Sequence, residues 1–183
     1  SKNNNNILRL STIRSAFPQS LIIVPFRDPL QQAVSLLSQH QQFCDSHRKN
    51  KFSREYMQWL GHHEFGLTHK PFCFESNIHN VITTYEPDDI NYWVTLWINT
   101  YRYLIDQKEP NSVFVCYETL CNQPELTLSG MLDMAGLPTK CDIQSVEIAV
   151  QPDRIVRDVD QSLSSKASSI YDSLCQRTNR RRE

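Results

Sequence analysis

Two short apolar runs stand out along the chain, and each has the length of a strand buried in a parallel sheet. The first covers residues 21–26 (Leu-Ile-Ile-Val-Pro-Phe), and the second covers residues 113–117 (Val-Phe-Val-Cys-Tyr). Pro25 interrupts the first run. Because proline cannot donate a ladder hydrogen bond, we expect the strand pairing to stop or bulge there.

Elsewhere apolar residues recur at three- and four-residue steps, which is typical of amphipathic helices. After a short helix that ends near residue 17, Asp28-Pro29 predicts the start of a helix that runs to about residue 43, with Ser35 facing away from its apolar stripe. Two further helices are expected, one beginning near residues 87–89 and one over residues 124–135. The first of these carries Trp93, Trp97 and Tyr101, which we interpret as core residues, while residues 44–87 predict short helices and loops.

Strands that alternate with helices predict an α/β domain, in which a mainly parallel sheet is covered by helices on both faces. A chain of 183 residues suits one such domain with a single hydrophobic core. We assign residues 1–176 to that domain. Residues 177–183, which include Arg180-Arg181-Arg182, are expected to form a basic, disordered tail.

Composition narrows the classes of protein. With 19 Lys+Arg against 20 Asp+Glu, the net charge of −1 argues against a nucleic-acid-binding protein. The six cysteines form no C-x-x-C pair, so free structural thiols are expected. No apolar stretch reaches the length of about 20 residues that spans a bilayer, and no signal peptide begins the chain, so we expect no membrane segment and a cytoplasmic location.

Arg27 and Ser35 are the first residues that indicate chemistry. Arg27 follows the first predicted strand, at the end where open α/β sheets bind ligands, and Ser35 comes eight positions later in the predicted helix. A guanidinium offers a planar fork of donors for a phosphate, and a serine hydroxyl can add another donor. The alternative is that Arg27 pairs with Asp28 or another carboxylate while Ser35 faces water.

Three sets of residues resemble those of sulfotransferases. The run from Ile22 to Pro29, followed by Ala33-Val34-Ser35, is similar to that family's signature for the 3′-phosphate of the donor 3′-phosphoadenosine 5′-phosphosulfate. The resemblance assigns Arg27 and Ser35 to this phosphate. The segment from Val115 to Leu120, with Pro124 after it, is similar to a second family motif and assigns Tyr117 to the adenine; a core tyrosine is the alternative. Lys2 is similar to a lysine near the transferred sulfuryl group, although it could equally be a solvated lysine near a chain end.

The resemblance implies a three-layer, P-loop NTPase-like fold and a metal-free transfer of the sulfuryl group to a hydroxyl or amine. The acceptor could be a glycan, a lipid, a small alcohol or a protein. The Gly/Ser/Thr-rich phosphosulfate loop and the first strand of the family are expected upstream of Ser1, so we expect this chain alone to be inactive. Two alternatives stay open, a P-loop kinase-like phosphotransferase and a non-catalytic nucleotide- or partner-binding module of the same fold.

The general base is not found at the position where the family often has a histidine, because Asn4 stands there. His63 and Glu64 are the leading substitutes, with His62, His69 and His40 as further candidates, because imidazole titrates near neutral pH. Surface polar residues are the alternative interpretation of this stretch. Arg154 and Arg157 are further candidates for contact with the 3′-phosphate.

Overall fold

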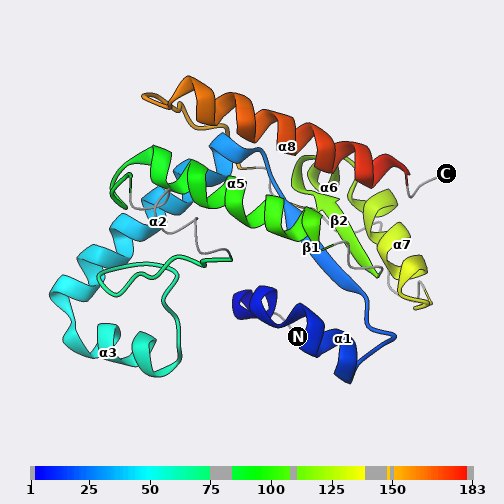
Figure 1. The fold of residues 1–183 in the computed structure, drawn as a ribbon, viewed down its shortest axis with the longest axis horizontal. Coiled ribbons are helices and arrows are strands. Elements are labelled where there is room, and N and C mark those ends of the chain that lie inside the picture. The colour runs from blue at the N-terminus through cyan, green and yellow to red at the C-terminus, as the bar shows by residue number, and fades with distance from the viewer. Residues whose placement is uncertain (1–2, 75–83, 108–110, 139–147, 149–150, 181–183) are drawn as a thin grey trace. The chain divides into compact units, whose positions relative to one another are not determined.

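A computed structural model describes residues 3–74, 84–107, 111–138, 148 and 151–180 (Figure 1). Lys2, one of the predicted catalytic residues, lies outside the described residues. Within them the chain forms two strands, seven α-helices and one 3₁₀-helix. In chain order these are η1 (Asn4–Arg9), α1 (Leu10–Ala16), β1 (Ile22–Phe26), α2 (Pro29–Lys49), α3 (Lys51–Trp59), α5 (Ile90–Asp106), β2 (Ser112–Cys116), α6 (Tyr117–Asn122), α7 (Pro124–Met134) and α8 (Gln161–Arg180).

The two strands pair in parallel, in a register that runs from Ile22 opposite Ser112 to Phe26 opposite Cys116. This confirms the predicted α/β class with a parallel sheet, which has two strands among the described residues. The expectation that pairing stops or bulges at Pro25 is wrong, because the register continues through it. The Ile22 amide donates to the Asn111 carbonyl at 2.9 Å, so the amides of alternate residues face β2 and the position of Pro25 faces away.

The chain divides into two compact units, and each is described by itself. The first unit contains Ser1–Asp28, Leu104–Asp153 and Tyr171–Glu183, and the second contains Pro29–Tyr103 and Arg154–Ile170. Helices α5 and α8 each contribute residues to both units.

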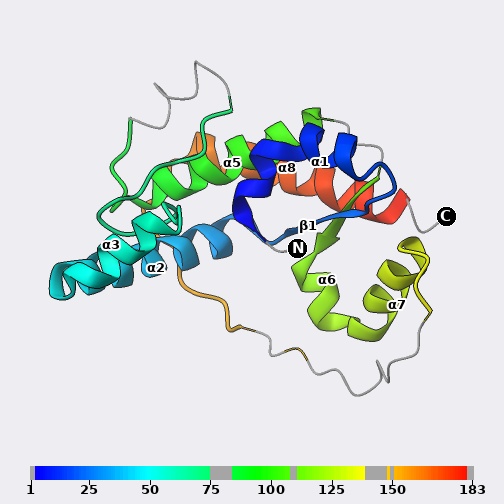
Figure 2. The same cartoon turned by 90° about the horizontal axis from the view of Figure 1, so that it is seen from below.

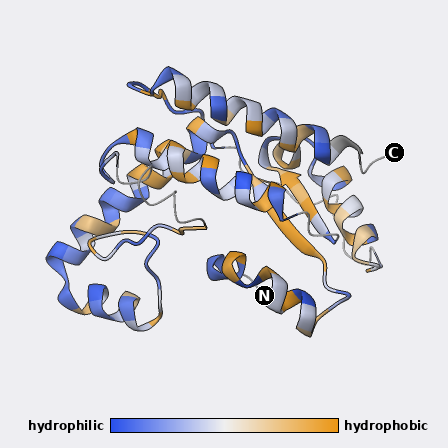
Figure 3. Cartoon of the chain, viewed as in Figure 1, coloured by the Kyte–Doolittle hydropathy of each residue, from blue (hydrophilic) through white to orange (hydrophobic). Residues whose placement is uncertain are grey.

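The core of the first unit is the two-stranded sheet and the second half of α8. All five residues of β2 are buried, and both strands appear as hydrophobic in Figure 3. The ring of Tyr171 meets the ring of Phe26 edge-on at 5.7 Å, and Leu174 is fully buried. The Thr178 hydroxyl donates to the Phe114 carbonyl at 3.3 Å, which fixes α8 along the sheet.

The sequence pattern at α8 was overlooked, although a capping signal was present. Asp160 accepts hydrogen bonds from the amides of Ser162 and Leu163, as an N-cap residue does. The helix continues to Arg180, so residues 177–180, assigned from the sequence to a disordered tail, form its last turn.

The core of the second unit is built from α5 and α2. Trp93, Trp97 and Tyr101 are buried on α5, which confirms their interpretation as core residues. Both indole N–H groups are satisfied, since Trp93 donates to the Pro87 carbonyl at 2.9 Å and Trp97 donates to the Gln32 side chain at 3.1 Å. The stretch predicted as short helices and loops begins within α2, which runs on to Lys49.

Candidate functional site

Arg27 and Tyr117 occupy the same edge of the sheet in the first unit. Phe26 and Cys116 are the last paired residues of the two parallel strands, so the residues that follow them leave the sheet at its carboxyl edge. The Arg27 guanidinium lies over the Tyr117 ring, with its central carbon 4.9 Å from the ring centroid. Two residues selected from separate sequence motifs are thus in contact.

Tyr117 differs from its prediction in one respect. It was expected to end the second strand, but β2 stops at Cys116 and Tyr117 is the first residue of α6. The change of direction at this junction presents its ring to Arg27.

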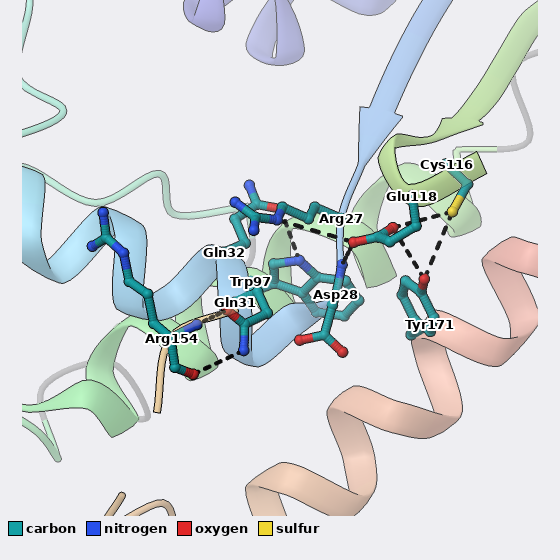
Figure 4. A network of polar contacts seen from close by, with 9 residues as sticks. All are labelled: Arg27, Asp28, Gln31, Gln32, Trp97, Cys116, Glu118, Arg154 and Tyr171. Atoms are coloured by element: carbon teal, nitrogen blue, oxygen red, sulfur yellow. Dashed lines mark hydrogen bonds and ion pairs between the residues drawn. The ribbon is translucent and has the colours of Figure 1, made fainter. Parts of the chain in front are cut away.

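Glu118, the next residue, ties the ends of both strands to α8 (Figure 4). Its carboxylate accepts the Asp28 amide at 2.9 Å, the Tyr171 hydroxyl at 3.1 Å and the Cys116 thiol at 3.2 Å. Burial, followed by the neighbouring Cys116 and Glu118, raises the pKa of Tyr171, so its hydroxyl stays protonated and continues to donate. Glu118 therefore fixes the sheet edge on which Arg27 lies.

Arg27 itself is largely enclosed but weakly paired. Its side chain is 17% exposed, and its Nε lies 4.0 Å from the nearer Glu118 oxygen, at the limit for an ion pair. That Nε is buried and has no hydrogen-bond partner among the described residues. The expected alternative, an ion pair of Arg27 with a carboxylate, is present in a loose form with Glu118, and the Nε donor remains unused.

Ser35 belongs to the second unit, where it lies half-buried on α2. Gln31, one turn earlier on the same face of the helix, exchanges two hydrogen bonds with the backbone of Arg154, at 2.8 and 3.1 Å (Figure 4). The segment that begins at Arg154 is thereby anchored near Ser35, while Arg157 is exposed. Because Arg27 belongs to the other unit, its joint role with Ser35 stays a prediction.

His63 and Glu64 lie in a compact turn of the second unit, after α3. The His63 Nδ1 lies 3.2 Å from the Thr68 carbonyl, which can only accept, so Nδ1 donates and Nε2 is the acceptor nitrogen of the neutral ring. Glu64 is near His62, with 3.5 Å between its oxygen and the His62 Nδ1. His63 Nε2 could take up a proton from an acceptor, and the role of His63 as the base stays a prediction.

Two histidines on the buried stripe of α2 hold this turn in place. The Gly66 amide donates to His40 Nδ1 at 3.3 Å, and the Leu67 amide donates to His47 Nδ1 at 3.2 Å. Burial lowers the pKa of His40 to about 4, with the neighbouring His69 acting in the same direction, and burial also lowers the pKa of His47. Both rings are neutral acceptors with a structural task.

His69 is engaged at both ring nitrogens. Its Nδ1 donates to the His63 carbonyl at 3.1 Å, and its Nε2 accepts the Tyr92 hydroxyl at 2.7 Å. Burial lowers the pKa of His69 and raises that of Tyr92, so both groups are neutral near pH 7. With both nitrogens occupied, His69 is a poorer candidate for the base than His63.

A pocket of about 710 Å³ opens beside these histidines. His40, Cys44, His69 and Tyr92 are among its lining residues. The Cys44 sulfur lies 3.4 Å from His40 Nε2, but burial raises the pKa of the thiol while that of the imidazole is lowered, so the pair is neutral. Among the described residues no group of three or more His, Cys, Asp or Glu side chains is placed to hold a metal ion.

Sequence reasoning missed four supporting roles, those of Glu118, His40 and His47 as hydrogen-bond acceptors and that of Tyr171 as a donor. Their signals are weak in a single sequence, because an acidic residue after a strand and histidines on an apolar stripe have many ordinary roles.

No described helix has the combination of length and apolar character that would span a membrane. Comparisons of the chain with protein-family models, with curated proteins and with solved structures found no match.

Proposed function

We propose that this chain belongs to a sulfotransferase that moves a sulfuryl group from 3′-phosphoadenosine 5′-phosphosulfate to a hydroxyl or amine acceptor. The single observation that carries the proposal is the contact of Arg27 with Tyr117 at the carboxyl edge of the parallel strands. The resemblance assigned these two residues to the phosphate and the adenine of one nucleotide. The P-loop NTPase-like, three-layer fold of the family is part of the same proposal.

The surroundings of Arg27 suit an anion. Its side chain is mostly enclosed, which strengthens charge-assisted hydrogen bonds, and its buried Nε donor has no hydrogen-bond partner among the described residues. The nearby Glu118 carboxylate already accepts three hydrogen bonds, which reduces its competition for the guanidinium. In the second unit, the anchoring of Arg154 beside the Ser35 face of α2 supports the assignment of that face to the phosphate.

The donor, when bound, supplies the activated sulfuryl group, and the side chains of the protein position it and move a proton. Lys2 is proposed to neutralise charge on the transferred group. His63 is the preferred base, because its Nδ1–H is held by the Thr68 carbonyl and its Nε2 can accept the acceptor's proton. Glu64 is retained as the alternative base.

The test is a calorimetric comparison of the affinities of this 183-residue chain for three nucleotides. Adenosine 3′,5′-bisphosphate and adenosine 3′-phosphate should bind more tightly than adenosine 5′-phosphate, which lacks the 3′-phosphate. A charge-assisted hydrogen bond contributes about 1.5–3 kcal/mol, so Arg27→Ala should weaken the bisphosphate by roughly tenfold or more. Arg102→Ala, which removes an exposed arginine from α5, is the matched control and should change nothing. Equal affinity for all three nucleotides would contradict the proposal.

The same measurements separate the alternatives. Tighter binding of ATP with Mg²⁺ than of the bisphosphate would favour a kinase-like phosphotransferase. Specific bisphosphate binding, without transfer of labelled sulfate to any acceptor class by the protein as it is expressed in its source, would favour a non-catalytic binding module.

A further inference from the structure

Helix α3 presents a row of aromatic side chains to solvent. Phe52, Tyr56 and Trp59 are 62%, 47% and 73% exposed, and Leu60, just after the helix, is 51% exposed. Spaced by four and three residues, the three aromatic residues share one face of the helix, and the rings of Phe52 and Tyr56 stack at 5.7 Å. We term Phe52, Tyr56, Trp59 and Leu60 the aromatic face.

Helix α3, which carries the aromatic face, is held by an N-terminal cap and by contact with α2. Asn50 caps α3 by accepting the Ser53 amide at 3.2 Å, and α3 contacts α2, beside which it lies in Figures 1 and 2. The half-buried residues Arg54 and Met57 lie on the side opposite the aromatic face. Arg54 and Met57 are thus partly covered within the second unit, while the aromatic face stays largely exposed among the described residues.

Basic residues adjoin the aromatic face. Arg48, Lys49 and Lys51 are exposed at the junction of α2 and α3, immediately before Phe52. Two of them form exposed pairs, Arg48 with Asp45 at 2.9 Å and Lys51 with Glu55 at 3.4 Å. Surface pairs of this kind are weak and are readily exchanged for another anion. The junction therefore combines positive charge with aromatic side chains.

We propose that the aromatic face docks into the headgroup region of an anionic lipid bilayer, with Arg48, Lys49 and Lys51 against the lipid phosphates. Phe and Trp beside Lys and Arg form the composition of helices that lie in the membrane interface, where the amphipathic rings of Trp and Tyr are accommodated. Trp and Tyr rank as polar on the hydropathy scale of Figure 3, so α3 does not stand out there. The basic junction provides the charge complementarity to an anionic surface.

A second copy of the chain is a poorer occupant. Aromatic side chains present about 150–250 Å² each, so at the exposures above the three rings offer roughly 300–450 Å². That is about half of the roughly 800 Å² per partner of a stable protein interface. Like charges at Arg48, Lys49 and Lys51 would also face each other in a symmetric dimer through this face.

Trp59 provides a direct readout. The other two tryptophans, Trp93 and Trp97, are each only 2% exposed, so a change of fluorescence on binding reports on Trp59. Addition of phosphatidylcholine vesicles that contain about a quarter phosphatidylserine should shift the emission to the blue, and the protein should float with the vesicles. Vesicles of phosphatidylcholine alone, or added salt at about 1 M, should weaken binding by roughly tenfold or more.

Two variants separate the aromatic and the charged contributions. Phe52→Ala with Trp59→Ala, followed by flotation, should reduce vesicle binding by roughly tenfold or more. Lys49→Gln with Lys51→Gln should reduce it by a similar factor, since each cation contributes about fivefold at an anionic surface. Ile155→Ala, which removes another strongly exposed apolar side chain, should leave binding unchanged.

The proposal would be overturned if the protein floated with neither kind of vesicle, or if vesicle binding survived loss of the aromatic side chains. It would also be overturned if the Trp59 emission shifted with protein concentration in the absence of lipid, because a second copy would then be the occupant. Binding to soluble dextran sulfate with no binding to vesicles would likewise assign the surface to a polyanion. Because the substituted side chains are exposed, the variants should keep the parent's far-ultraviolet circular dichroism and urea-unfolding midpoint, and these measurements confirm that each is folded.

Discussion

Acid should destabilise this protein through His40, and the structure gives both the direction and the size of the effect. The folded-state pKa of His40 is about 4, against 6.5 when unfolded, because the ring is buried. Below pH 6.5 the unfolded chain binds a proton that the folded chain does not bind until about pH 4. The contribution of His40 to the free energy of unfolding is therefore fully present above pH 6.5 and is lost as the pH falls from 6.5 towards 4.

The difference in pKa corresponds to about 3 kcal/mol, a large part of the stability of a small domain. Burial sets this direction, and protonation of Nδ1 would in addition place its N–H against the Gly66 N–H, whose hydrogen bond it now accepts. Among the titratable groups near His40, His69 and Arg48 lower its pKa further, whereas Asp88 raises it and moderates the effect. His47 and His69, whose pKa values are also lowered, should add to the loss in the same direction.

The assay is urea unfolding of the parent and of His40→Asn at several pH values between about 7.5 and 4.5. The asparagine side-chain oxygen can take the place of Nδ1 as acceptor but does not titrate, so over this pH range the variant should lose less stability than the parent, by up to about 2.5 kcal/mol. His62→Asn, which replaces a partly exposed histidine of the same loop, is the matched control. If His40→Asn and the parent lose the same free energy between these pH values, the structural role assigned to His40 is wrong.

Two further predictions concern the loop and the thiols. Gly66→Ala should lower the free energy of unfolding in urea by about 3 kcal/mol or more, because the φ of Gly66 is +83° and a Cβ there would lie 2.5 Å from the His47 ring. Gly61→Ala, at a φ of +71° with open space around it, should lower that free energy by only about 1 kcal/mol. Equal losses of stability in the two variants would contradict this account. Burial raises the pKa of Cys175 to about 11, so iodoacetamide near pH 7.5 should modify exposed Cys73 roughly a hundredfold faster, as followed by peptide mass spectrometry. Comparable rates would show that Cys175 is more accessible than its position on α8 indicates.

The elements that could be predicted from the sequence are those with a strong local signal. The two apolar runs, the Asp28-Pro29 helix start and the aromatic helix of Trp93 and Trp97 all appear in the structure. Each of these signals is a period or a cap within a few residues. The interruption expected at Pro25 fails for a non-local reason, since the side of β1 that faces β2 is set by the register with β2.

The candidate site was predictable only in part, because its support is made of contacts between distant segments. Arg27 and Tyr117 belong to separate sequence motifs, and the structure brings them into contact, while their roles toward a nucleotide stay a prediction. That Glu118 joins Asp28, Cys116 and Tyr171 could not be inferred, since it depends on the packing of α8 against the sheet. A single sequence carries no pattern for such a junction.

The histidines of α2 show how loop structure and proposed chemistry are connected. An aliphatic residue at position 40 or 47 would suit the buried stripe, but it would leave the Gly66 or Leu67 amide without its acceptor, at a cost of about 1–3 kcal/mol each. The same loop carries His63, whose Nδ1 is held by the Thr68 carbonyl within it. Release of the Gly66 amide from His40 would therefore free the backbone that orients His63, so any activity that uses His63 Nε2 should decline together with the stability that His40 provides. If the activity of His40→Asn still falls on acidification while the variant stays folded, the loss of activity would instead be assigned to protonation of the base itself.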